Sequence, residues 1–221
     1  PVRITVNNHL PEPTTVHWHG LEVPNSMDGV PDVTQPPIAP GDSFTYDFTV
    51  PETPGTFFYH THFAADRQQP LGLYGAFLID APNAPALAYD QEYLLQLGEW
   101  RIQDGMTYPA MDFDGMLPNY FTINGKAYPA TETIHVNVGE TVLLRFVGTG
   151  QIVATDGYPV PAGSQFTKDT VLVGPGERYD VIWTATQPGT WLIHCHINHH
   201  VTNNGEEMDG GGGLTMVIQV S

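Results

Sequence analysis

PIAPGDSFTYDFTVPETPGTFFYHTH (residues 37–62) and LVGPGERYDVIWTATQPGTWLIHCH (residues 172–196) follow one pattern in the two halves of the sequence. Each copy runs from apolar residues through Pro-Gly and an acid, an alternating run, Pro-Gly-Thr and an aromatic run to a closing His-x-His. Alternation of apolar and polar residues predicts half-buried strands, and Pro-Gly pairs predict the turns between them. The repeat therefore predicts a duplicated β domain.

Short alternating runs also occupy other parts of the chain, which carries 23 Gly and 20 Pro. We expect strands at residues 2–6, 43–50, 133–138, 141–147 and 214–220. Short strands separated by frequent turn residues are typical of β-sandwiches. The sequence predicts an all-β fold with two domains, residues 1–83 and 84–221, divided within the Pro- and Ala-rich stretch APNAPALA (residues 81–88).

The composition limits the classes of partner. Seven Lys and Arg against 24 Asp and Glu give a net charge of −17, which repels nucleic acid and anionic lipid. The same charge either serves solubility or attracts cationic substrates and metal ions. No apolar run approaches the roughly 20 residues that span a bilayer. The chain opens at Pro1 directly in a strand-like run, so we expect a trimmed, periplasmic or secreted protein whose export signal has been removed.

Six of the 10 histidines form three His-x-His pairs: His17 and His19, His60 and His62, and His194 and His196. Residues i and i+2 of a strand point to the same face, so each pair is expected to offer two imidazoles side by side. Cys195, the single cysteine, then points to the opposite face from the last pair.

These residue types suit metal ions. Neutral imidazoles bind copper, zinc, iron or nickel, whereas a thiolate with imidazoles and a weak axial group is typical of a blue-copper centre. Cys195 and His200, five residues apart across a turn, supply a thiolate and an imidazole. One strand is therefore predicted to touch two metal sites, His194 and His196 on one face and Cys195 on the other. A single such pair is usually ordinary surface and a lone Cys usually packs in a core, but three pairs argue against coincidence. His9 and His135 are expected to be an exposed turn residue and a half-exposed strand residue, not ligands.

The motifs HWHG (17–20), YHTH (59–62) and HCHINHH (194–200) resemble those of multicopper oxidases, the cupredoxin-fold family of laccases, ascorbate oxidase and ferroxidases. DGVPDVTQPPIAPG (28–41) and VATDGYPV (153–160) are also similar to the family, and the resemblance covers nearly the whole chain. With two repeats, the sequence is most similar to the two-domain laccase-like branch. The resemblance implies two cupredoxin-like Greek-key β-sandwich or barrel domains.

The resemblance also implies a role for each histidine. His17 would bind the type 2 copper, and the type 3 pair would be bound by His19, His60, His62, His194 and His196. Cys195 and His200 would bind the type 1 copper in domain 2. In such proteins the trinuclear cluster lies between domain 1 of one subunit and domain 2 of the next, which implies a homotrimer. A ring of heterologous interfaces meets that requirement.

Two further residues match family positions with catalytic roles. Asp28 matches an acid near the type 2 copper and its bound water, although an Asp before Gly also forms turns without any such role. His199 stands where some relatives carry an acid that relays protons to the cluster, and a loop histidine without a role is the alternative.

The family pattern is broken at one place. A fourth motif, HPxHxH, would supply one type 1 ligand and two cluster ligands, but TVLLRFVGTGQ (141–151) passes directly into IVATDGYPV (152–160). The phrases on both sides fit the family, so we expect the full protein to contain this segment, and also a strand before Pro1. A chain truly without the segment is expected to hold copper poorly and not to reduce O2 to water.

The sequence leaves three candidates for the residue at the axial position of the type 1 copper. The family places Leu, Met or Phe after a Gly, which favours Leu214 after Gly213, with Met208 and Met216 as alternatives. The run of glycines at 210–213 is expected to be a flexible loop.

The leading hypothesis for function is an oxygen-reducing oxidase that takes single electrons from phenols or from Cu(I), Fe(II) or Mn(II). It implies a type 1, a type 2 and a binuclear type 3 copper site, with about four copper ions per subunit if the HPxHxH segment is present. One alternative is a copper nitrite reductase, against which the HCH sequence argues because that enzyme has no type 3 pair. The other is a copper-storing or electron-carrying cupredoxin.

Overall fold

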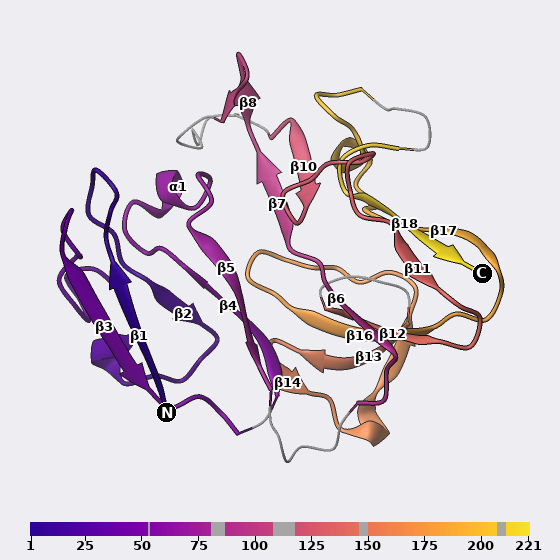
Figure 1. Ribbon diagram of the computed structural model, residues 1–221, viewed down its shortest axis with the longest axis horizontal. Helices are drawn as coiled ribbons and strands as arrows, with labels where there is room; N and C mark the ends of the chain where they lie inside the picture. Colours follow the sequence, from indigo (N-terminus) through magenta and orange to yellow (C-terminus); the bar gives the residue numbers. More distant parts are fainter. Residues whose placement is uncertain (53, 81–86, 108–117, 146–149, 207–210) are drawn as a thin grey trace. The chain divides into compact units, whose positions relative to one another are not determined.

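The structure is a computed structural model that describes residues 1–52, 54–80, 87–107, 118–145, 150–206 and 211–221 (Figure 1). The described residues are almost all in strands, turns and loops, which confirms the predicted all-β fold. The helical elements found there are one short α-helix and three 3₁₀ turns: α1 (Ala65–Gln68), η1 (Asn25–Met27), η2 (Ala162–Ser164) and η3 (Asn198–Val201). No helix in this described part is long and apolar enough to cross a membrane.

By its internal contacts the chain divides into two compact units, and the N-terminal unit is formed mainly by Pro1–Ala84. Its strands form two sheets, β1-β3 and β2-β4-β5, each antiparallel throughout. The bounds are β1 (Val2–Asn7), β2 (His17–His19), β3 (Ser43–Phe48), β4 (Gly55–His60) and β5 (Tyr74–Ile79). Every second side chain of β1 and β3 is buried or half-buried, as their alternating sequences predict. The buried core takes Tyr46 and Phe48 from one sheet and Trp18, Phe57 and Ile79 from the other.

The C-terminal unit is formed mainly by Pro85–Tyr108, Asp112–Thr155 and Pro159–Ser221. Its larger sheet has the order β14-β13-β16-β12-β6, with β15 paired to β13, and its second sheet has the order β11-β18-β17. Two smaller pairs are β10-β7 and β8-β9. The core contains residues of β10, β11, β12, β17 and β18. The bounds are β6 (Gln91–Leu94), β7 (Leu97–Trp100), β8 (Ile102–Gln103), β9 (Met106–Thr107), β10 (Tyr120–Ile123), β11 (Ile134–Val136), β12 (Thr141–Arg145), β13 (Gly150–Thr155), β14 (Tyr158–Pro159), β15 (Phe166–Lys168), β16 (Tyr179–Thr184), β17 (Gly189–His194) and β18 (Thr215–Val220).

The two copies of the repeat fold alike. The first copy forms β3 and β4, and the second forms β16 and β17. In each copy the two strands belong to different sheets of the unit, and the aromatic strand begins at the Gly of Pro-Gly-Thr. In each copy the aromatic strand also ends at the first histidine of His-x-His, His60 or His194. The repeat therefore delivers a histidine pair to the same end of the same strand in both units.

A buried ion-pair network crosses three strands of the larger C-terminal sheet. Arg145 of β12 lies opposite Asp180 of β16, and its Nη1 donates to Asp180 Oδ2 at 3.0 Å. Its Nε donates to Glu92 of β6, the neighbour of β12 on the other side. The side chains of Arg145 and Asp180 are only 8% and 5% exposed, so their charges are compensated by partners inside the sheet and not by water.

We therefore expect Arg145→Met to lower the free energy of unfolding by about 3–5 kcal/mol, because it removes a buried cation that compensates the carboxylates of Asp180 and Glu92. Urea unfolding followed by circular dichroism measures the loss. Arg3→Met is the matched control, since Arg3 forms an exposed pair with Asp47 and should cost less than about 1 kcal/mol. Equal losses in the two variants would contradict the assignment.

Candidate metal centres

Three histidines of the N-terminal unit converge on one point. The β2-β4 ladder sets His17 directly opposite His60, and His19 lies two residues along β2 on the same face. One ring nitrogen from each of the three lies within 4.8 Å of the others. His19 Nδ1 and His60 Nε2 are 3.3 Å apart. Two ring lone pairs this close repel each other unless a proton or a cation lies between them.

Contacts on the other side of the rings set which nitrogens are free. His17 Nδ1 lies 2.7 Å from the backbone oxygen of Asp28 and 3.4 Å from its carboxylate. His60 Nδ1 lies 2.8 Å from the backbone oxygen of Thr61. When each Nδ1–H donates to its carbonyl, Nε2 of that ring keeps the lone pair that binds a metal ion. The His19 ring stacks on Phe58, with centroids 4.3 Å apart, and turns Nδ1 toward His60.

Burial favours the metal-binding form of His60. Desolvation lowers the pKa of this imidazole, and repulsion from His17 and His62 lowers it further, against a hydrogen bond to Thr61 that raises it. A lowered pKa keeps the ring neutral near neutral pH, and only the neutral imidazole offers its lone pair to a metal ion.

His62 borders this cluster without belonging to its closest group. It lies beyond the end of β4, is exposed, and its ring centroid is 5.5 Å from that of His17 and 6.1 Å from that of His60. The structure thus brings four of the predicted ligands to one face.

A second constellation surrounds Cys195 in the C-terminal unit. Its Sγ lies 3.6 Å from Nδ1 of His200, which the 3₁₀ turn η3 brings back toward it. The backbone N–H of Ile197 also donates to this sulfur at 3.4 Å. The His200 ring stacks on the buried Phe121 of β10, with centroids 4.2 Å apart at 20°. Burial lowers the pKa of His200 and so favours its neutral form.

Leu214 connects the two residues of this constellation through its main chain. Its N–H donates to the His200 carbonyl at 2.9 Å, and its own carbonyl accepts from the Cys195 N–H at 3.1 Å. Leu214 is buried, and Cys195 packs against the core cluster to which it belongs. Met216 lies two residues further along, opposite Ile193, and Met208 lies outside the described residues.

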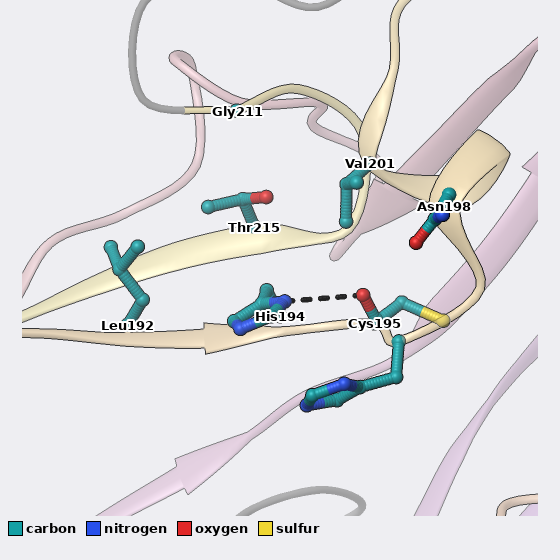
Figure 2. A pocket seen from close by; sticks show the side chains of 8 residues that line it. Leu192, His194, Cys195, Asn198, Val201, Gly211 and Thr215 are labelled. Atoms are coloured by element: carbon teal, nitrogen blue, oxygen red, sulfur yellow. Dashed lines mark hydrogen bonds between the residues drawn. The ribbon is translucent and has the colours of Figure 1, made fainter.

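His194 and His196 flank Cys195 on the other side. Their ring centroids are 4.8 Å apart and both side chains are exposed. They line a shallow pocket together with Leu192, Cys195 and Thr215. Figure 2 shows the Cys195 sulfur turned away from the His194 ring, which is the opposed arrangement that alternation along the strand predicts.

Some details differ from the sequence-based expectation. The strands end at His60 and His194, so His62, Cys195 and His196 lie just outside them, although the paired rings still lie side by side. His199 lies beside His200 and Phe121, with ring centroids 4.4 and 5.7 Å away. The place where HPxHxH would stand, between Gln151 and Ile152, lies within β13.

Sequence reasoning missed the residues that support the ligands. Phe58 and Phe121 stack on His19 and His200, and Gln69 Nε2 donates at 3.1 Å to the Thr61 carbonyl, which also lies 2.8 Å from His60 Nδ1. Aromatic residues in strands are ordinary core formers, and a glutamine in a short helix carries no pattern of its own. Only their spatial contacts single them out.

Comparison with known proteins identifies the family. Family models of multicopper oxidases match residues 1–84 and 104–205. The structure of a blue copper oxidase from Nitrosomonas europaea is similar with a TM-score of 0.85 and 33% identity, over 99% of this chain and 73% of that one. The chain is 33% identical to Laccase-1 of Cryptococcus neoformans over 81% of its own length and 34% of the relative's. It is 31% identical to multicopper oxidase MmcO of Mycobacterium tuberculosis over 82% of its length and 44% of that protein's.

The chain belongs to the multicopper oxidase family, as its motifs predict. The multicopper oxidases whose structures it matches are built of cupredoxin-type β-sandwich domains, so the predicted fold class is confirmed. The chain spans between a third and a half of the length of the curated relatives described above. The family binds copper, and the neutral imidazoles and the thiolate described above are a donor set that suits copper.

Gly29 gives a test of how the backbone positions His17. Its φ of +80° favours glycine, and an added Cβ would meet the Val16 carbonyl oxygen at 1.9 Å and the His17 nitrogen at 2.9 Å. We expect Gly29→Ala to displace His17 and to lower both stability and the affinity of the cluster for Cu(II). Thermal unfolding and Cu(II) titration measure the two effects.

Gly41→Ala is the control for that experiment. Gly41 has a φ of +85° but nothing within 4 Å of the added Cβ, so it carries the backbone cost of about 1–2 kcal/mol without the clash. A Gly29→Ala variant no worse than Gly41→Ala in Cu(II) affinity would show that Gly29 does not position His17.

Proposed function

We propose that this chain is a laccase-like multicopper oxidase. It would oxidise phenolic, aromatic or metal-ion donors one electron at a time and reduce O2 to water with four of these electrons and four protons. The observation that carries the proposal is the placement of Cys195 between His194 and His196, with His200 beside its sulfur. Bound copper supplies the redox chemistry, and the residues of the chain supply its ligands, its surroundings and a covalent connection between the two kinds of site.

Cys195 and His200 are proposed as ligands of a type 1 copper, with Leu214 at the axial position. The main-chain bonds of Leu214 to both residues support this choice over Met216. A leucine side chain does not coordinate copper, and a site without a strong axial ligand is expected to have a higher reduction potential. The stacking of His200 on Phe121 holds the ligand ring in one orientation.

The remaining histidines are proposed as ligands of a trinuclear cluster. His17 would hold the type 2 copper, and the type 3 pair would be held by His19, His60, His62, His194 and His196. In a homotrimer the first four would come from one subunit and the last two from its neighbour. The exposure of His194 and His196, together with exposed Trp191, Leu192 and Ile197 on the same segment, supports a subunit interface there.

Asp28 and His199 are proposed as the acid–base residues. Asp28 holds Nδ1 of His17 through its carbonyl and places its carboxylate 3.4 Å from the same nitrogen, where it can accept a proton. His199 is exposed and can exchange protons with solvent.

A copper-carrying cupredoxin is the second candidate function, because the sequence contains no HPxHxH segment. The two functions differ in stoichiometry and in reactivity. An oxidase with a complete cluster should hold about four copper ions per subunit and consume O2 with a phenolic donor. A carrier should hold one or fewer, remain folded and consume none. We propose a periplasmic or secreted location for either.

The central test is Cys195→Ser. We expect the wild-type protein with its HPxHxH segment, loaded with copper, to show an intense blue absorption and to consume O2 with a phenolic donor, and the variant to lose both. Loss of the thiolate removes the ligand that gives a blue-copper centre its character. Visible spectroscopy and an oxygen electrode measure the two properties.

His135→Gln is the control for Cys195→Ser. His135 is an exposed residue of β11 that belongs to neither histidine cluster, so its replacement should change neither colour nor oxygen uptake. Undiminished oxygen uptake in Cys195→Ser would refute the oxidase assignment.

The acidic surface predicts a dependence of the rate on salt. With a net charge of −17, electrostatic attraction should raise the rate for a cationic donor such as Fe(II) at low ionic strength. Raising the salt concentration from about 0.01 to 0.15 M shortens the Debye length from about 30 to 8 Å and should lower kcat/KM for that donor. A neutral phenol should show little change, and an equal response of both donors would argue against steering.

A further inference from the structure

The side chain of Gln68 connects the two chain segments that carry the N-terminal histidines. Gln68 lies at the end of α1 and is 1% exposed. Its Oε1 accepts hydrogen bonds from the hydroxyls of Thr14 at 2.9 Å and Thr61 at 2.8 Å. Its Nε2 donates to the carbonyl of Pro13 at 2.9 Å. One buried amide thus joins the segment that precedes His17 to the residue between His60 and His62.

This network is closed around its central oxygen. An amide oxygen has two lone pairs, and both lone pairs of Gln68 Oε1 are used by the two threonine hydroxyls. All three side chains are buried. The two hydroxyls also have contacts nearby, since Thr14 Oγ1 lies 3.3 Å from Thr61 Oγ1 and Thr61 Oγ1 lies 3.1 Å from the Phe63 carbonyl oxygen. A buried network whose members are satisfied by one another restricts their motion.

The two segments that Gln68 joins differ in their other contacts. The segment that contains Thr14 continues into β2, where pairing with β4 already positions His17 and His19 against His60 and Phe58. The segment that contains Thr61 begins directly after His60, where the pairing between β2 and β4 ends. Beyond His60, the Thr61 N–H donates to Leu73, and the Thr61 hydroxyl also accepts from the Phe63 N–H at 3.2 Å.

His62 therefore depends on Thr61. It is exposed and lies beyond the end of β4. The Thr61 hydroxyl on one side of it donates to Gln68 Oε1 and accepts a hydrogen bond from the N–H of Phe63 on the other side. Gln69 adds a second bond to the segment, from its Nε2 to the Thr61 carbonyl at 3.1 Å.

We propose that Gln68 is a positioning residue that acts through the Thr61 hydroxyl to hold His62 against the metal cluster. The proposal rests on the proposed function only in taking the N-terminal histidines as metal ligands. Gln68 and Thr61 touch no metal ion themselves. Their effect is to reduce the freedom of the one N-terminal ligand that no β-ladder holds.

The test compares two isosteric substitutions in the full-length chain. Thr61→Val and Thr14→Val each remove one hydroxyl donor from the same Gln68 oxygen, with little change in shape. We expect Thr61→Val to weaken Cu(II) binding that depends on His62 by about 10- to 100-fold, the range for lost supporting contacts of metal ligands. Thr14→Val should weaken it only a few-fold or less, and Thr61→Ser, which keeps the hydroxyl, should bind as the wild type does.

A double-mutant cycle separates positioning from a general loss of structure. If Thr61 acts through His62, Thr61→Val should have no further effect on Cu(II) affinity in a His62→Ala background. Equilibrium dialysis with copper analysis measures the four affinities, and circular dichroism checks that each variant is folded. Additive effects of the two substitutions, or equal effects of Thr61→Val and Thr14→Val, would overturn the proposal.

Oxygen uptake by the wild-type chain is measured separately. A chain that binds copper through His62 but consumes no O2 would refute the proposed oxidase activity. The double-mutant cycle would still test whether Gln68 positions His62. A wild-type chain whose Cu(II) affinity is unchanged by His62→Ala would overturn the role of Gln68, whatever its oxygen uptake.

Discussion

The register between β2 and β4 is the constraint on which the N-terminal cluster depends. It sets His17 opposite His60 and places His19 on the same face. Side chains alternate along a strand, so a slip of one residue would turn these imidazoles away from each other and expose the buried Trp18 instead. The packing of Trp18 with Phe57 and Tyr46 therefore fixes the position of the histidines as well as the core.

The C-terminal centre is organised by a turn and not by a ladder. The strand β17 ends at His194, and the following 3₁₀ turn brings His200 back to the sulfur of Cys195. The stack of His200 on Phe121 fixes the ring at one side of this turn. Strands and a packed core thus carry candidate ligands that themselves lie at or just beyond strand ends.

The repeat was informative in the sequence because strands and turns have local signatures. The alternation in β3 and β16, and the Pro-Gly turns before β4 and β17, predicted these strands and the histidines at their ends. The described strands between residues 91 and 123 were not predicted, since they have two to four residues each, too few to show an alternating pattern. Gln68 was not predicted either, because its role arises from contacts with residues 54 and seven positions away in the sequence. Leu214 is one of three axial candidates, favoured in the sequence by the preceding Gly213, and its assignment stays a proposal that the hydrogen bonds of its main chain support.

The two hydrogen bonds of Leu214 belong to its backbone. The positions of Cys195 and His200 therefore do not depend on which side chain stands at 214. The frame that holds Cys195 and His200 is built from peptide groups that every residue at position 214 other than proline would supply. In the proposed site the side chain at the same position would lie beside the type 1 copper, where its identity would tune the reduction potential. In that site a substitution at position 214 would change the driving force of electron transfer while the peptide frame stays the same, which would let relatives adapt to donors of different oxidisability.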